Sequence, residues 1–246
     1  MKTNIDRCFL SCKHANTIDR GFLPSRLVDV TGHALRIIYP HGGRRERLDT
    51  RYVTLSYCWG NPNQASSQLK LTNSVHKRLQ SGFTINELAP IQRDAVRVTQ
   101  ALSVPFIWID ALCIMQGDRL DWEQESATMD RIYASSYVTI CILTSNSCQD
   151  GFIERLNHPG RIRLPYDPTT AISGESYELG HGAICENPGV SGWNESDLES
   201  NTWNTRGWTF QEKLMSTRRL YFGNAGLHFS CSNRLSSEYC GVEQEP

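Results

Sequence analysis

Glu125 stands out because it is a carboxylate on a predicted apolar helix face. Residues 121–136, DWEQESATMDRIYASS, have the spacing of an amphipathic helix when each residue turns by about 100°. The apolar arc contains Trp122, Met129, Ile132, Tyr133 and Ser136, together with Glu125. An isolated ionised carboxylate in a core costs several kcal/mol, so Glu125 must be neutral, paired with a cation, or directed into a cleft.

Two roles fit a carboxylate in this position. In a cleft, partial burial would raise the pKa of Glu125, which could then act as a general acid or base or hold a sugar hydroxyl. In a closed core, an ion pair with an arginine such as Arg206 would hold the carboxylate instead. The sequence alone leaves both roles open.

A second acidic residue, Asp110, interrupts the apolar run FIWIDALCI. A carboxylate is costly in a central strand unless it is paired or lies where the strand ends. Asp110 can form a structural latch with Arg206 or with backbone amides, or it can take part directly in chemistry.

The segment TRGWTFQE concentrates functional groups near the end of the chain. Within eight residues it contains Arg206, Trp208, Gln211 and Glu212. These side chains can line a site with a cation, a stacking ring and hydrogen-bonding groups. They can equally form a packed corner in which Trp208 belongs to the core and Arg206 binds carboxylates or carbonyls.

Cysteines offer metal-binding or nucleophilic chemistry. Cys8, Cys12 and His14 have a spacing that can place three soft ligands near one metal ion, but no fourth ligand is evident, and structural zinc sites usually have four. Cys58 and Cys113 lie near the ends of predicted strands, and either can be a nucleophile or a small buried hydrophobe. A nucleophilic role needs a histidine base, and neither segment contains one.

Alternating strands and helices must position these residues. Apolar strands are predicted at residues 52–60, 105–114 and 137–143, with helices from Pro90 and from Asp121 between them. In the second helix, Asp121 is expected to be the cap and Gln124 its partner. This alternation over residues 50–145 predicts a parallel sheet covered by helices, with its ligand crevice at the carboxyl ends of the strands.

Weaker β-structure is predicted on either side of this unit. Short strands are expected in LPSRLVDV and ALRIIY, and again in RIRLPY and GAICEN. In the last block, TFQEKLMS is expected to be a short helix, and RRLYFG and GLHFSC to form a hairpin. We therefore expect a single domain over residues 1–246, with a β-rich elaboration over residues 146–240.

Composition narrows the functional class. The chain has 246 residues, of which 39% are hydrophobic and 21% charged, as in ordinary soluble globular proteins. Its net charge of −1 offers no basic field for nucleic acid, and no apolar run is long enough for a membrane span. Nine cysteines, an odd number, and an N-terminus without the apolar core of a signal peptide favour a reducing, cytoplasmic setting.

The sequence lacks the motifs of the common α/β enzymes. It contains no dinucleotide-binding glycine motif, no phosphate loop and no nucleophile elbow.

Five blocks together span residues 23–222, in the order LPSRLVDV, YVTLSYCWG, RDAVRVTQAL, FIWIDALCIMQGDRLDWEQESATMDRIY and TRGWTFQEKLMSTRRLYF. In their order and spacing they resemble the heterokaryon incompatibility (HET) domain of filamentous fungi. The chain ends at Pro246, soon after the last block, which fits either an isolated HET domain or a shortened chain.

This resemblance implies a role in non-self recognition, in which family members trigger programmed cell death when incompatible cells fuse. It also implies protein partners or self-assembly. The family is described as distantly similar to TIR domains, whose flavodoxin-like fold can hydrolyse NAD with a glutamate on a helix. By this analogy YVTLSYCWG corresponds to the first TIR strand, and the fold is expected to be a flavodoxin/TIR-like parallel sheet.

The TIR analogy assigns roles to residues, with NAD as substrate and no further cofactor. Glu125 would be catalytic, holding the ribose or stabilising the developing oxocarbenium charge. The expected substrate-binding residues are Ser56, Trp59, Asp110, Gln116, Arg206 and Trp208, with a tryptophan stacking on a ring and Arg206 meeting phosphate. The alternative is a non-catalytic signalling module in which Glu125 is a structural anchor.

Overall fold

The fold was obtained as a computed structural model, which describes most of the first 154 residues and shorter segments beyond them. The described residues are 1–12, 21–41, 49–154, 162–165, 181–184, 201–205, 207–224, 226–232 and 234–237. Within these residues, no helix combines the length and apolarity needed to cross a membrane.

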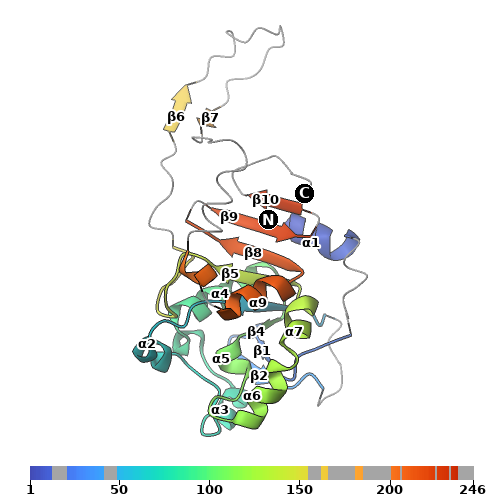
Figure 1. The fold of residues 1–246 in the computed structure, drawn as a ribbon, viewed down its shortest axis with the longest axis vertical. Helices are drawn as coiled ribbons and strands as arrows, with labels where there is room; N and C mark the ends of the chain where they lie inside the picture. The colour runs from blue at the N-terminus through green and yellow to red at the C-terminus, as the bar shows by residue number, and fades with distance from the viewer. Residues whose placement is uncertain are drawn as a thin grey trace.

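Four parallel strands form the centre of an eight-stranded sheet (Figure 1). They are β3 (Tyr52–Ser56), β4 (Phe106–Trp108), β5 (Val138–Ile142) and β8 (Arg218–Phe222). Their spatial order is β4-β3-β5-β8, so the first strand along the chain lies between the second and the third. This is the strand order of a flavodoxin-like sheet, whose switch point lies between β3 and β5. The predicted α/β class is confirmed.

Antiparallel strands flank this parallel centre on both sides. On one side lie β1 (Leu27–Asp29) and β2 (Arg36–Ile38), and on the other β9 (Leu227–Cys231) and β10 (Arg234–Ser237). The predicted hairpin is formed by β8 and β9. A separate antiparallel pair, β6 (Ile162–Pro165) and β7 (His181–Ile184), contains the two strands predicted after residue 145, and most other residues up to 200 lie outside the described segments.

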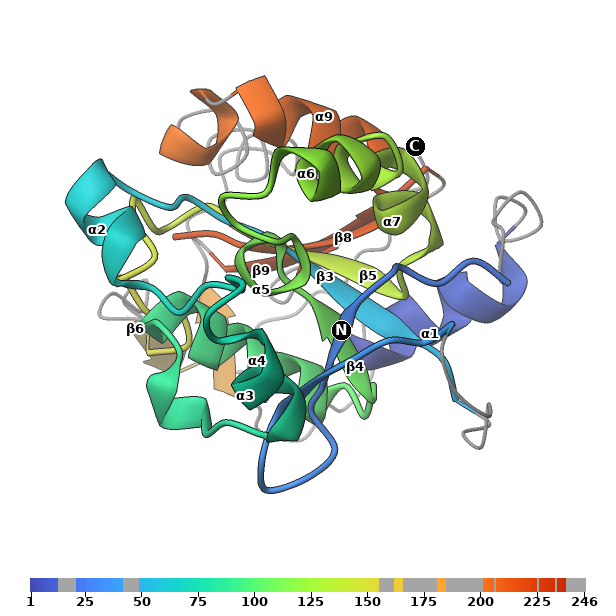
Figure 2. The same cartoon turned by 90° about the horizontal axis from the view of Figure 1, so that it is seen from below.

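Helices cover both faces of the sheet. On one face lie α6 (Arg119–Ser126), α7 (Met129–Ser135) and α9 (Gly207–Met215), and on the other α3 (His76–Ser81) and α4 (Pro90–Ala101) (Figure 2). The other helices within the described residues are α1 (Lys2–Ser11), α2 (Pro62–Ser67), α5 (Asp110–Cys113) and the 3₁₀ turns η2 (Ile85–Glu87) and η4 (Thr202–Thr205). Pro90 lies in the first turn of α4, as predicted, because a missing N–H costs nothing there.

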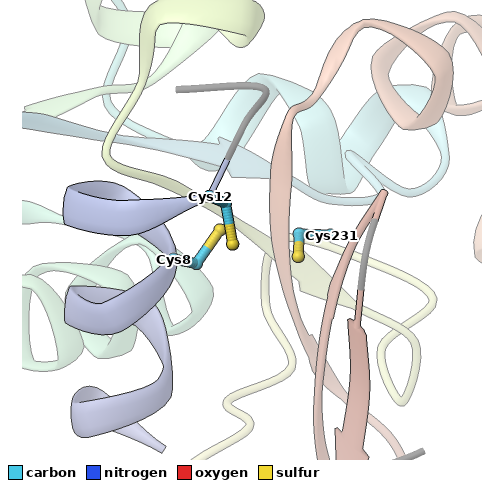
Figure 3. A group of neighbouring side chains, drawn as sticks. All are labelled: Cys8, Cys12 and Cys231. Atoms are coloured by element: carbon cyan, nitrogen blue, oxygen red, sulfur yellow. The ribbon is translucent and has the colours of Figure 1, made fainter. Parts of the chain in front are cut away.

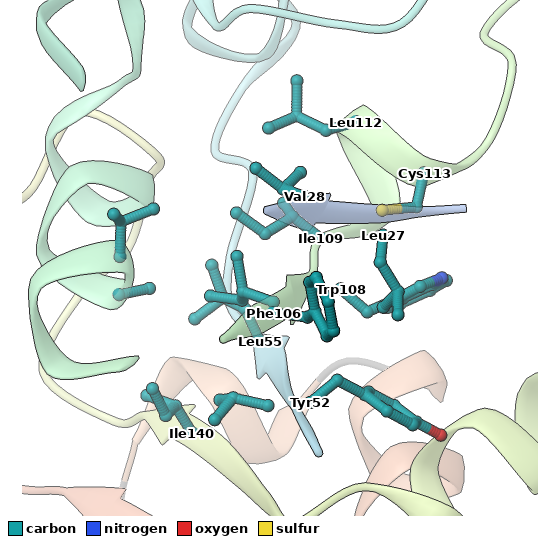
Figure 4. Close-up of a cluster of buried hydrophobic side chains, with 14 of the residues drawn as sticks. Leu27, Val28, Tyr52, Leu55, Phe106, Trp108, Ile109, Leu112, Cys113 and Ile140 are labelled. Carbon is teal, nitrogen blue, oxygen red and sulfur yellow. The ribbon is translucent and has the colours of Figure 1, made fainter. Parts of the chain in front are cut away.

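The core lies where these layers meet the central strands. Every residue of β3 and of β5 is buried, as expected for strands covered on both faces. Figure 4 shows Tyr52 and Leu55 of β3 packed with Phe106, Trp108 and Ile140 of the neighbouring strands.

Two predicted boundaries are wrong, and both affect candidate site residues. The second apolar strand ends at Trp108, and Asp110 begins the short helix α5 instead of interrupting a strand. The predicted helix over residues 121–136 is two helices, α6 and α7, and Asp118 caps the first by accepting hydrogen bonds from the backbone of Leu120 and Asp121. Asp121 lies inside the first turn of α6, and its carboxylate binds Arg26.

The break between α6 and α7 changes which residues share a face. Met129, Ile132 and Tyr133 of α7 are buried as predicted, but Trp122 of α6 is 48% exposed. Glu125 is buried at the end of α6, with 4% of its surface exposed. The apolar arc therefore describes α7 and does not extend through α6.

Candidate functional site

Glu125 lies in a buried cluster with Arg26 and Asp121, here called the Arg26 cluster. Arg26 Nη2 lies 3.1 Å from Glu125 Oε1 and donates to both carboxylate oxygens of Asp121 at 2.6 and 2.7 Å. Arg26 Nε donates to the carbonyl oxygen of Cys113 at 2.7 Å, and the backbone N–H of Met115 donates to Asp121. The cluster therefore joins the segment before β1 to α5 and α6.

Burial governs the protonation of Glu125. Loss of solvent raises the pKa of Glu125 above its usual value, and the charge of Asp121 raises it further, while Ser25 and Arg26 act in the opposite direction. The cation beside Glu125 is Arg26, which precedes it by 99 residues, and Arg206 lies outside the described residues. This geometry matches the ion-pair role expected of a carboxylate in a closed core.

Three other predicted residues lie together where β3 and β4 end. Trp59 Nε1 donates to Asp110 Oδ2 at 2.9 Å, and Asp110 Oδ1 accepts from the N–H of Ala111 at 2.7 Å. Gln116 Nε2 donates to the backbone carbonyls of Ile114 at 3.0 Å and Asp110 at 3.4 Å. Asp110 thus forms the predicted latch, with an indole and a backbone amide as its partners.

Ser56 belongs to a second group, here called the Ser56 cluster, formed with Trp203 and Glu212. Ser56 ends β3, and its hydroxyl donates to the carboxylate of Glu212 on α9 while accepting from Trp203 Nε1 at 2.8 Å. All three residues are at most 9% exposed. Burial raises the pKa of Tyr133, and the neighbouring Glu212 charge raises it further, which places Glu212 beside α7 as well.

This second cluster lies at the switch point of the sheet. Ligands of open α/β sheets bind outside the carboxyl ends of the strands, at the point where the strand order reverses. A pocket of about 400 Å³ is lined by residues that follow β5 and β8 and by residues of η4. Thr202 and Thr205 line the pocket from the same turn that carries Trp203.

A second pocket of about 320 Å³ lies beside α6. Gln116, Arg119 and Trp122 are among its lining residues. Within the described part of the chain, Glu125 lines neither of these two pockets. Ser56 and Glu212 are not among the described lining residues of either pocket, so the two buried carboxylates do not differ in this respect.

The structure describes only some of the remaining predicted site residues. His14, Arg206 and the side chain of Trp208 lie outside what the structure describes. Cys58 is buried, and burial raises the pKa of Cys113 to about 12, which disfavours the thiolate that a nucleophile needs. Among the described residues, no hydrogen bond joins Cys113 to a histidine.

The sequence singled out Glu212 within TRGWTFQE but gave no reason to pair it with Ser56, and Trp203 was missed. The segment NTWNT carries an aromatic residue among turn-forming polar residues, which is the pattern of a short helical turn with one buried side chain. The metal hypothesis also changes, because Cys8 and Cys12 lie beside Cys231.

Comparison with protein families places these elements in a known group. The model of the heterokaryon incompatibility protein (HET) family matches residues 52–212. Comparison with curated proteins and with solved structures finds no match. The matched region begins with β3 and ends at Glu212, so it contains both the Trp59–Asp110 pair and the Ser56 cluster. It covers well over half of the chain, which therefore belongs to the heterokaryon incompatibility (HET) family.

Proposed function

We propose that this protein is an effector of fungal non-self recognition that triggers programmed cell death when incompatible cells fuse. The family match supports this role, because residues 52–212 contain the first three parallel strands and the polar residues at their carboxyl ends. The proposal further holds that the effector acts by hydrolysing NAD, as the TIR analogy implies.

The observation that carries the chemical part of the proposal is the position of Glu212 at the switch point. NAD hydrolysis breaks the bond between nicotinamide and ribose, water adds to the ribose carbon, and nicotinamide, ADP-ribose and a proton result. Glu212 would stabilise the positive charge that develops on the ribose, and Ser56 would orient the carboxylate by its hydrogen bond. The threonine and asparagine side chains of the pocket lined by η4 would bind hydroxyl or phosphate groups.

Glu125 has a different role in this proposal. Its carboxylate is held by Arg26, so it serves as an anchor between α6 and the segment before β1. The catalytic assignment that the TIR analogy gave to Glu125 passes to Glu212, which lies on another helix on the same face of the sheet (Figure 2).

NAD consumption by the purified protein tests this assignment. We expect wild type to release nicotinamide, and Glu212→Gln to lose about 10²–10³-fold in rate, the size of effect seen when one charge-stabilising group is removed. Glu125→Gln should remain within a few-fold of wild type, as should Glu123→Gln, its exposed neighbour on α6. Circular dichroism and melting temperature confirm that each variant is folded.

Two results would contradict the assignment. If wild type leaves NAD intact under conditions in which it kills cells, NAD hydrolysis is wrong. If folded Glu125→Gln is inactive while Glu212→Gln keeps its rate, the catalytic carboxylate is Glu125.

A second candidate function is non-catalytic signalling by self-assembly, and the surface of α9 favours it. Phe210 and Leu214 are 64% and 70% exposed and lie one helical turn apart, so they form a small apolar face. Replacing both with serine should lower the oligomeric mass and abolish killing if another copy of the chain binds there. Leu10→Ser is the matched control, because Leu10 is 73% exposed on α1. Killing that survives the double replacement excludes assembly through this face.

A further inference from the structure

Three cysteines from distant parts of the chain meet between α1 and the sheet. Cys8 lies within α1, Cys12 follows its last residue, and Cys231 is the last residue of β9. Their sulfur atoms all lie within 4.8 Å of one another (Figure 3). Figure 3 shows the side chains of Cys8 and Cys12 directed from the helix toward the strand that carries Cys231.

Contacts along α1 fix this arrangement. The hydroxyl of Tyr137 donates to Asp6 Oδ1 at 2.6 Å, and the Phe9 and Tyr137 rings lie 5.3 Å apart. Near the N-terminus of α1, Asn4 Nδ2 donates to Ser236 Oγ of β10 at 3.0 Å. Because residues four apart in a helix share a face, the same docking directs both Cys8 and the following Cys12 toward β9.

The geometry of the three sulfurs suits a soft metal ion. Zinc–thiolate bonds are about 2.3 Å long, so thiolates around one tetrahedral zinc ion lie roughly 3.8 Å apart. The observed group needs only a small contraction to reach that spacing. Thiolate is also the ligand type that selects zinc and copper(I) over magnesium or calcium. A divalent cation bound by the three sulfurs would displace the thiol protons and offset the repulsion between neighbouring thiolates.

Burial leaves one side of the site open. Cys8 and Cys231 are 2% and 6% exposed, whereas Cys12 is only partly buried. A metal ion bound here would thus be enclosed by protein on the Cys8 and Cys231 side and reachable by solvent on the Cys12 side. Three protein ligands with one exchangeable position is the coordination of an open zinc site.

We propose that Cys8, Cys12 and Cys231 bind one Zn²⁺ ion as thiolates, with a water molecule as fourth ligand, and that the ion clamps α1 onto β9. Each thiol loses its proton to solvent as its sulfur binds zinc, so one ion releases up to three protons and leaves a complex of charge −1. Arg218, whose guanidinium lies over the Phe9 ring at 5.1 Å, partly offsets that charge. The proposal concerns a site apart from the Ser56 cluster and does not depend on NAD hydrolysis.

Titration of the reduced, metal-free full chain with Co²⁺ tests the site. Tetrahedral thiolate coordination of Co²⁺ gives intense visible absorption and sulfur-to-metal charge transfer in the near ultraviolet. We expect one Co²⁺ per chain, displaced by one Zn²⁺, and a melting temperature that rises when Zn²⁺ is added. Cys8→Ser and Cys231→Ser should each weaken binding at least 100-fold.

Cys148→Ser is the matched control. Cys148 is also buried, but its sulfur hydrogen-bonds to the carbonyl of Gln64, a bond that serine can keep. If the buried replacements fail to fold, Cys12→Ser serves instead, because its side chain is only partly buried. Absence of the charge-transfer band in wild type, or an unchanged band in folded Cys231→Ser or Cys12→Ser, would overturn the proposal.

Discussion

Replacing Arg26 with methionine tests whether the Arg26 cluster is a structural joint. Arg26 is 5% exposed and is the shared cation of Glu125 and Asp121, whose side chains are 5% and 19% exposed. Removing one partner of a buried ion pair costs about 3–5 kcal/mol, because the other charge stays buried without compensation. Arg26→Met leaves two buried carboxylates without their shared cation. We therefore expect a loss in the free energy of unfolding within that range at pH 7.

The pH dependence of this loss has a definite sign. Because burial raises the pKa of Glu125 in the folded state above its unfolded value, the folded chain holds this proton more tightly. The resulting stabilisation is complete below the unfolded pKa and is lost as the pH rises through the folded pKa. Without Arg26 the folded pKa of Glu125 rises further, so the cost of Arg26→Met should be smaller at pH 5 than at pH 7.

Urea unfolding followed by tryptophan fluorescence at both pH values measures these costs. Arg119→Met is the control, because Arg119 is 88% exposed in its pair with Glu123 and should cost at most about 0.5 kcal/mol. A cost for Arg26→Met below about 1 kcal/mol at pH 7, or an equal cost at pH 5, would refute the structural role of the cluster.

Other replacements test the carboxyl edge of β3. Ser56→Ala leaves the buried indole N–H of Trp203 without its acceptor and should lower the free energy of unfolding by about 2–3 kcal/mol in urea titrations; a loss below about 0.5 kcal/mol would contradict this. Gly60→Ala should destabilise by about 3 kcal/mol, because Gly60 has φ +87° and a Cβ there would lie 2.6 Å from Ser147 Cβ. Gly117→Ala, at φ +85° with no atom within 4 Å, should cost only about 1 kcal/mol in the same assay, and equal losses at the two glycines would show that the contact with Ser147 is relieved without cost.

Strands of the parallel centre could be predicted from sequence because each is a short, almost wholly apolar run that ends in polar turn residues. β3 and β5 follow this pattern, and all of their residues are buried. The place of β8 could not be predicted in the same way. Its residues indicate a local hairpin with β9, but its other neighbour is β5, with Thr139 opposite Arg219. The pattern of residues within β8 does not indicate its pairing with β5, which lies far away in the sequence.

The candidate site shows the same limit. Helical spacing placed Glu125 among apolar residues and left its role open between a cleft and a closed core, and its partner Arg26 lies 99 residues earlier, in a segment predicted only as a short strand. The end of α6 was missed because residues 126–128 contain neither glycine nor proline. Glu212 was noticed for its chemistry, yet its pairing with Ser56 spans 156 residues and depends on how α9 packs against β3.

The docking of α1 on β9 has a consequence for synthesis. The helix is made first, but the strand that receives Cys8 and Cys12 follows later in the chain (Figure 1). At about 5–20 residues per second, the roughly 220 residues between them take about 10–45 s to translate. During that interval the buried face of α1, with Ile5 and Cys8, lacks the strand β9 that covers it in the folded protein. The thiols of Cys8 and Cys12 therefore stay without their third partner until nearly the whole chain has been made.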